Sequence, residues 1–276
     1  MNNVNTEILV NKMIEDVLKS KVELSACALS EMRSSNLSDF CQVRFMLTWI
    51  ENKKEEDSFM KGFFCDIGTV VHSLVQKWLG LKGYLYGLWK CPVCKKIVKE
   101  GFGGSVRCCQ GNLCVYEEYS LMWKGMTGHC DGLLLINNEF YILELKTISI
   151  RGFKERCKLE EPLDYHQDQV NMYILMGQKL ELPYPIVGGI VVYMQRDNPT
   201  KYKAFPQQGI DLKRVQNTIR DYKLAKNMVF TGKFKNLIKK CKKYGDSPYC
   251  SYKGMCFRDG LEEFITKTWK LENEDA

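Results

Sequence analysis

Several features that would assign this chain to a class directly are missing from it. None of its apolar runs is long enough to cross a bilayer, so the sequence does not predict a membrane-spanning protein. The first residues, MNNVNTEILVNKMIEDVLKS, carry acids within their apolar pattern and lack the basic start and apolar core of a signal peptide. The sequence contains no internal repeat, no low-complexity tract and no Walker-type phosphate loop, so helicase activity is not expected. These absences predict a protein made and kept in a reducing cytosol.

Cysteine and positive charge, by contrast, are plentiful. The chain has 13 cysteines among 276 residues and a formal net charge of +7. Because disulfides are rare in a reducing compartment, clustered thiols there indicate metal binding. The positive charge favours a polyanionic partner, although a solvated basic surface would give the same number.

The residue pattern alternates between helices and strands. Apolar spacing and capping residues predict helices over 4–20, from Ser38 to about Ile50, over 67–81, over 163–180, and from the cap Asp211 to about 230. Strand-like runs cover 115–123, 126–136, 139–147 and 187–195. This order predicts an α/β or α+β fold with a central mixed sheet under helices.

Residues 128–147, GHCDGLLLINNEFYILELKT, predict a β-hairpin. Asn137-Asn138 suits a two-residue turn because Asn tolerates positive φ. With these two residues as the turn, Ile136 pairs with Glu139, and every pair further out follows from that register.

The predicted register brings charged groups together. Asp131 lies opposite Glu144, and Lys146 shares the same face of its strand. Two adjacent carboxylates repel each other, and Mg²⁺ or Mn²⁺ between them would remove the conflict, with the backbone carbonyl of Leu145 as a further ligand. Lys146 would then orient the attacking water or help to deprotonate it. The alternative is a polar, solvent-facing strand edge, but the apolar residues of the second strand indicate that it is buried.

Two helices add polar candidates. His72 is one of three histidines and lies four residues after Gly68, on the same helix face, where it would serve as a third metal ligand. Gln169 and Tyr173 share a face of a later helix and would support the lysine or a phosphate. The alternatives are a surface histidine and an ordinary amphipathic helix with Tyr173 in the core and Gln169 exposed.

In this order, the pieces resemble the RecB-like nuclease family of the PD-(D/E)XK superfamily. The matching segments are GTVVH (68–72), GHCD (128–131), ELK (144–146) and QVNMY (169–173), and Glu117 or Glu118 corresponds to an acid that often precedes the aspartate. The likeness covers residues 33–258, apart from an insertion, and includes CRISPR-associated adaptation exonucleases and their viral relatives. It implies a restriction-endonuclease-like core in which the catalytic residues are Asp131, Glu144, Lys146, Gln169 and Tyr173.

The resemblance extends to iron–sulfur members of this family, which have one cysteine near the start and three near the end. Here Cys41 precedes a helix, and Cys241, Cys250 and Cys256 lie in the basic tail. The resemblance implies a [4Fe–4S] cluster on these four thiolates. Cys241 departs from the family spacing, because C-x8-C stands where C-x2-C is usual, and zinc is the competing metal.

Residues 87–115 are rich in Gly and Cys and predict a small inserted module of the zinc-ribbon kind. A module of this size and glycine content could hardly fold without metal, although a redox pair or a structural loop is the alternative. The Zn²⁺ ligands that we expect are Cys91, Cys94, Cys109 and Cys114, with Cys108 as the alternative to Cys109. Lysines and Arg107 surround them, so the module is expected to contact DNA or a partner.

Basic side chains elsewhere would neutralise phosphates and give salt-sensitive binding, although solvation alone explains any single one. The DNA-binding side chains that we predict are Arg33, Arg44, Arg151, Lys154, Lys239 and Lys240.

Together these observations predict a Mg²⁺- or Mn²⁺-dependent exonuclease that acts on single-stranded or frayed DNA ends. We expect it in the cytoplasm of a prokaryotic cell, where a phage genome is an alternative origin of its gene. Proteins of recombination, replication or CRISPR adaptation would be its partners. The alternatives are a DNA- or partner-binding protein whose nuclease activity is secondary, and a site-specific endonuclease. We expect four regions: 1–86 with the first cluster cysteine, the insertion 87–115, the nuclease core 116–232 and the basic cysteine-cluster region 233–276.

Overall fold

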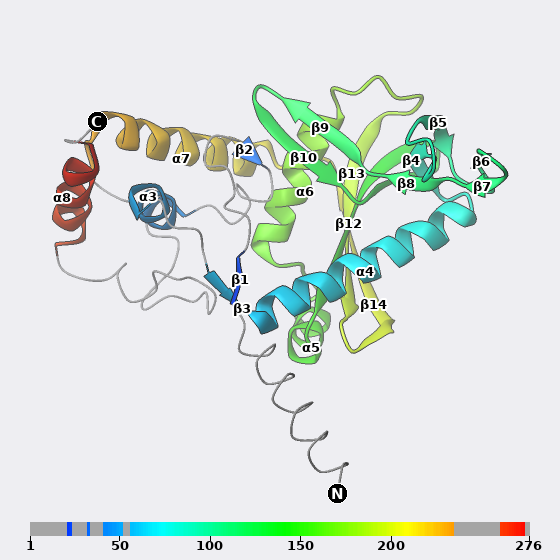
Figure 1. Ribbon diagram of the computed structural model, residues 1–276, viewed down its shortest axis with the longest axis horizontal. Helices are drawn as coiled ribbons and strands as arrows, with labels where there is room; N and C mark the ends of the chain where they lie inside the picture. Colours follow the sequence, from blue (N-terminus) through cyan, green and yellow to red (C-terminus); the bar gives the residue numbers. More distant parts are fainter. Residues whose placement is uncertain (1–20, 24–31, 34–40, 52–55, 235–259, 274–276) are drawn as a thin grey trace, which may run out of the picture. The chain divides into compact units, whose positions relative to one another are not determined.

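The computed structural model describes residues 21–23, 32–33, 41–51, 56–234 and 260–273 (Figure 1). The chain divides into two compact units. Unit 1 comprises Met1–Leu29, Cys41–Ile67 and Ala225–Ala276, and unit 2 comprises Ser30–Phe40 and Gly68–Leu224. Each helix within the described ranges is too short or too polar to span a membrane.

A mixed β-sheet forms the centre of unit 2 (Figure 1). Its strand order is β14–β13–β12–β11–β4–β5, and β8 pairs with β4. β12 and β13 are parallel, whereas the other described pairs of this sheet are antiparallel. The strands are β4 (Leu85–Lys90), β5 (Ile97–Phe102), β8 (Val115–Glu117), β11 (Gly132–Ile136), β12 (Glu139–Ile148), β13 (Ile186–Gln195) and β14 (Asn198–Gln208).

Helices cover both faces of this sheet. On one face, Leu143 and Leu145 of β12 pack against Val75 and Leu79 of α4 (Phe59–Leu81). On the other face lies α6 (Asp164–Gly177), which packs mainly on β13. α5 (Ile150–Leu159) follows β12, and α7 (Leu212–Thr231) follows β14. The predicted fold class, a central mixed sheet flanked by helices, is therefore confirmed.

The predicted hairpin is formed by β11 and β12. Asn137 and Asn138 have φ values of 53° and 62°, and Ile136 pairs with Glu139 as the turn chemistry requires. The run 126–136, which was predicted as one strand, is instead two strands that meet at Asp131. β10 (Met126–Cys130) pairs with β9 (Tyr119–Trp123) and β2 (Met32–Arg33) in a separate small sheet. Asp131 therefore lies where the chain passes from one sheet to the other.

The cysteine-rich region is less separate than the sequence suggested. β4, β5 and β8 all belong to the central sheet, and only the short hairpin of β6 (Arg107–Cys108) and β7 (Asn112–Leu113) stands apart from it. Apolar periodicity could not reveal this, because β5 is exposed along most of its length.

Unit 1 contains the remaining described elements. β1 (Lys21–Glu23) pairs with β3 (Glu56–Ser58), and α3 (Gln42–Glu51) packs against α8 (Leu261–Asn273). α3 agrees with the predicted helix ending near Ile50, whereas α4 begins at Phe59, earlier than predicted. The helix predicted over 4–20 and the cap Ser38 lie outside the described residues.

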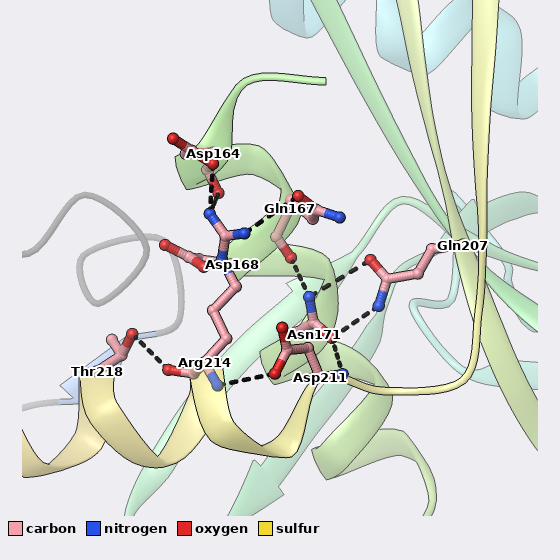
Figure 2. A network of polar contacts seen from close by, with 8 residues as sticks. All are labelled: Asp164, Gln167, Asp168, Asn171, Gln207, Asp211, Arg214 and Thr218. Carbon is pink, nitrogen blue, oxygen red and sulfur yellow. Dashed lines mark hydrogen bonds and ion pairs between the residues drawn. The ribbon is translucent and has the colours of Figure 1, made fainter. Parts of the chain in front are cut away.

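A polar network holds α6 against the start of α7 (Figure 2). The guanidinium of Arg214 forms ion pairs with Asp164 and Asp168 of α6. Oδ1 of Asn171 accepts hydrogen bonds from Nε2 of Gln207 and from the backbone N–H of Asp211, both at 2.7 Å. Oδ1 of Asp211 in turn accepts the N–H of Arg214, which agrees with its predicted role as the cap of this helix. The N-terminal half of α6, which carries predicted site residues, is therefore firmly positioned.

Candidate active site

Asp131 connects three parts of the fold. Its Oδ2 accepts a hydrogen bond of 2.6 Å from the backbone N–H of Leu145, and its Oδ1 lies 3.3 Å from Nδ1 of His72 on α4. Gly68, one turn before His72, brings α4 close to β12, because a Cβ at this position would lie only 3.1 Å from Oγ1 of Thr147. The small residue and the histidine of the predicted pair thus act together to bring His72 to the aspartate.

Glu144, which is buried, forms an ion pair on β12 with the half-buried Lys146. Oε1 of Glu144 lies 2.6 Å from Nζ of Lys146, and Glu144 is only 3% exposed. Burial raises the pKa of Glu144 to about 7, Lys146 opposes the rise, and the charge of Asp131 adds to it. Burial alone would lower the pKa of Lys146, but the neighbouring Glu144 outweighs it and the net shift is upward. The lysine is therefore charged at neutral pH.

A glutamine that the sequence reasoning missed completes the surroundings of Asp131. Gln76 lies one turn after His72, is buried, and donates through Nε2 to Oε1 of Glu118 at 2.9 Å and to the carbonyl of Asp131 at 3.0 Å. Of the two acids left open by the sequence, Glu118 therefore belongs to this site. Glu117 forms an ion pair with Lys90 instead. The four-residue interval between His72 and Gln76 was the available signal.

Gln169 and Tyr173 are both buried in α6. Nε2 of Gln169 donates a hydrogen bond of 2.8 Å to the hydroxyl of Tyr173. The alternative of an exposed Gln169 is therefore wrong, because this residue is 6% exposed. The contact between the two side chains fits a supporting role, since a buried amide needs hydrogen-bond partners.

His166 and Tyr193 also belong to this region, and the sequence analysis did not select them. Tyr193 of β13 is paired with Lys146 in the parallel register, so the two side chains lie on one face of the sheet. The Tyr193 hydroxyl lies 2.6 Å from Nδ1 of His166 on α6. Burial, together with the charge of Lys146, lowers the pKa of His166 to about 2. The histidine is thus neutral and lies close to the lysine.

Four cysteine sulfurs converge where β4, β5 and the β6–β7 hairpin meet. Among the residues that the structure describes, Cys91, Cys94, Cys108 and Cys109 are the group of metal-binding type whose donor atoms all lie within 4.8 Å of one another. Sγ of Cys108 lies 3.9 Å from Sγ of Cys94 and 3.7 Å from Sγ of Cys109. A tetrahedral ion with metal–sulfur bonds of about 2.3 Å requires sulfurs about 3.8 Å apart, so this group could hold a metal ion.

The ionisation of these thiols also favours a cation. Backbone N–H groups of Cys94 and Val93 lower the pKa of Cys91 to about 7. The neighbouring sulfurs, first that of Cys94, raise the pKa of Cys109 to about 12. One thiolate therefore forms readily, and further ones need a positive charge among them.

One of the four thiols in this group differs from the expected zinc ligands. Cys108 and Cys109 both belong to the group, whereas Cys114 lies outside it. Cys114 is buried beside Trp89 and Cys91, and its backbone N–H bonds to the carbonyl of Val106. Cys109 has a φ of 23°, a left-handed turn that lets two consecutive cysteines contribute to one group, and spacing alone could not predict this.

The remaining predicted residues lie on other elements or outside the described residues. Cys41 directly precedes α3, and its carbonyl accepts the N–H of Phe45. Arg151 and Lys154 are exposed on α5. Arg33 lies in β2 and Arg44 in α3. Cys241, Cys250, Cys256, Lys239 and Lys240 lie outside the described residues.

Comparison with known proteins gives structural likenesses of low identity. No protein-family model and no curated protein matches the chain. The crystal structure of SSO0001 matches with 14% identity and a TM-score of 0.41, over 93% of this chain and 98% of that one. An alkaline exonuclease from Laribacter hongkongensis matches with 12% identity and a TM-score of 0.41, and its complex with dAMP with 11% and 0.42, each over 74% of this chain and 93% of the other. The function must therefore be inferred from the side chains described above.

Proposed function

We propose that this chain is a metal-dependent nuclease that hydrolyses phosphodiester bonds of DNA. Two neighbouring contacts carry the proposal. Asp131 lies against His72 and the backbone N–H of Leu145, and Glu144, next to Leu145 on β12, pairs with Lys146. The charges of Asp131 and His72 also act on Glu144. Two buried carboxylates beside a half-buried amine are costly to maintain in a protein unless they serve a purpose.

The donor set fits a hard divalent cation. Carboxylate oxygens of Asp131 and Glu144 and the imidazole of His72 would hold Mg²⁺ or Mn²⁺, and the carbonyl of Leu145 is a further candidate. When bound, such an ion lowers the pKa of a coordinated water and offsets negative charge on the phosphate. With a pKa of about 7, the carboxyl group of Glu144 is partly protonated at neutral pH, and a bound cation would favour its charged form.

Lys146 would act as a charged group. Its raised pKa supports a role in orienting the attacking water and stabilising phosphate charge, rather than in removing a proton. Gln169 and Tyr173 would support this centre from α6. The resemblance of the sequence to RecB-like nucleases suggests action at the ends of single-stranded or frayed DNA, which the net charge of +7 would attract. Proteins of recombination, replication or CRISPR adaptation are proposed as partners on the same resemblance.

The direct test is cleavage of an end-labelled single strand by the purified chain with Mn²⁺, Mg²⁺ or EDTA. Glu144→Gln and Asp131→Asn should each lower the rate more than about a hundredfold, because metal ligation contributes several kcal/mol to such reactions. Glu139→Gln, at the hairpin turn of the same strand, is the matched control and should cleave like the wild type.

Cleavage that persists in EDTA, or in both acid variants, would contradict the proposal. Tight DNA binding without any cleavage would favour the binding protein instead. A circular single strand distinguishes the two modes of cleavage, because an exonuclease leaves it intact and an endonuclease does not.

We also propose that the four-thiol group binds Zn²⁺, for which tetrahedral thiolate sites are typical. The expected ligands are now Cys91, Cys94, Cys108 and Cys109. Cys108→Ser should abolish stoichiometric zinc, whereas Cys114→Ser should retain it, as measured by metal analysis of the purified proteins. Zinc retained by the Cys108 variant and lost from the Cys114 variant would restore the set expected from spacing.

A [4Fe–4S] cluster on Cys41, Cys241, Cys250 and Cys256 is proposed on the sequence resemblance alone. The same metal analysis after anaerobic purification tests it, because about four irons per chain are expected. A second zinc in place of iron would identify the competing metal.

A further inference from the structure

His166 is set in a hydrogen-bonded arrangement that the proposed chemistry has not yet used. The residue is 7% exposed and lies in the first turn of α6. The Tyr193 hydroxyl accepts a hydrogen bond from the backbone N–H of Leu163 at 3.0 Å and lies 2.6 Å from Nδ1 of His166. One hydroxyl thus joins the start of α6 and the histidine ring to β13.

This arrangement decides which ring nitrogen carries the proton. Tyr193 is fully buried, and its oxygen already accepts from Leu163. If Nδ1 of His166 also donated to this oxygen, the hydroxyl proton would have no acceptor among the described residues, which is costly in a protein interior. The hydroxyl therefore donates to Nδ1, and the proton of the neutral imidazole resides on Nε2.

The Nε2–H group is consequently a donor. No residue that the structure describes accepts a hydrogen bond from it. The ring lies near Lys146, since the charge of this lysine acts on His166 and since Tyr193 and Lys146 are paired in the sheet. The first turn of α6 is also held from the other side, where Arg214 pairs with Asp164 and Asp168 (Figure 2). A donor held rigidly on a largely buried ring beside the catalytic lysine is suited to an anion.

We propose that His166 is a phosphate-binding residue of the catalytic centre, which donates Nε2–H to an anionic oxygen of the DNA strand. This inference rests on the proposed nuclease function. An uncharged donor suits the place because a second cation beside Lys146 and a divalent ion would be repelled by both. The ring thus adds a hydrogen bond to the phosphate without adding charge.

Two substitutions separate the ring's nitrogens. Gln places its amide nitrogen near the position of Nε2, and Asn places its amide near that of Nδ1. His166→Gln should bind and cleave DNA within about fivefold of the wild type, whereas His166→Asn should lose roughly ten- to a hundredfold, the range for a hydrogen bond to a charged group. Tyr193→Phe removes the hydroxyl that keeps the ring proton of His166 on Nε2. This variant should therefore also bind and cleave DNA less well than the wild type. His129→Asn, at an exposed position of β10, is the control and should change nothing.

Binding is measured on an end-labelled single strand in Ca²⁺, and single-turnover cleavage in Mn²⁺, with a thermal melt of each variant. Wild-type binding and cleavage by His166→Asn would overturn the inference. Equal losses in the Gln and Asn variants would also overturn it, because the role would then be structural. If Glu144→Gln still cleaves, the proposed function fails, whereas cleavage that depends on Glu144 but not on His166 contradicts this inference alone.

Discussion

At the scale of single residues, Glu144, Asp131 and His166 are buried titratable groups that interact electrostatically with Lys146. Glu144 pairs with Lys146 directly, and the charge of Lys146 also acts on His166. Asp131 is held separately by His72 and Leu145. Each buried charge thus has a specific partner, as low polarity of the surroundings requires.

The lowered pKa of His166 has a consequence for stability. In the unfolded chain the imidazole takes up a proton below about pH 6.5, whereas the folded protein keeps it neutral down to a pKa of about 2. The stabilisation is therefore present above pH 6.5 and is lost as the pH falls, by up to about 1.4 kcal/mol per pH unit. Urea unfolding between pH 8 and pH 4.5 should show a shallower loss in His166→Gln than in the wild type.

The stability of the two proteins above about pH 7.5 serves as the internal control of this experiment. Above about pH 7.5 the two stability curves should run parallel, because neither form of residue 166 titrates there. A wild-type slope equal to that of the variant below pH 6.5 would show that the histidine is protonated in the folded protein.

At the scale of elements, the packing of α6 on β13 depends on a residue without a side chain. A Cβ at Gly189 would lie 2.2 Å from Cγ1 of Val170, so α6 could approach this strand only at a glycine. This contact sets the height of α6 above the sheet and hence the position of His166 and Gln169.

Gly189→Ala should therefore force α6 away from β13 and lower the free energy of unfolding by about 1–3 kcal/mol, measured by urea denaturation. Gly152→Ala in α5 is the matched control, because its nearest atom, Oγ of Ser149, lies at an ordinary 3.4 Å. This control should be neutral or stabilising by up to about 1 kcal/mol. Similar unfolding midpoints for both variants would contradict the packing argument.

At the scale of the whole molecule, the net charge of +7 predicts salt-sensitive binding to DNA. Arg151 and Lys154 are exposed basic residues on α5, which directly follows the strand of Glu144 and Lys146. Replacing both by Ala should lower the slope of log affinity against log salt by about 1.4, the value for two phosphate contacts on a single strand. Fluorescence anisotropy at several salt concentrations measures this slope.

A control of equal charge uses Lys82 and Lys179, which follow the C-terminal ends of α4 and α6. Lys82 lies ten residues beyond His72, about 15 Å along a helix. Their double Ala variant should keep the wild-type slope. Equal slopes in both double variants would mean that net charge, and not contacts near the acids, governs binding.

The sequence by itself determined the features that depend on local geometry. The turn Asn137-Asn138 sets the register of β11 and β12, and that register is why Asp131 and Glu144 could be expected to meet. Helical spacing likewise related Gln169 to Tyr173. Both arrangements can be predicted without knowledge of the fold, because each lies within one hairpin or one helix.

Only the tertiary structure decided the contacts between distant segments. Gln76 reaches Asp131 across 55 residues, and His166 meets Tyr193 across 27. The choice of Cys108 over Cys114 depends on a left-handed turn at Cys109. Such pairings depend on how helices pack on a sheet and on the conformation of one turn, and sequence spacing carries information on neither, because many packings share the same periodicity.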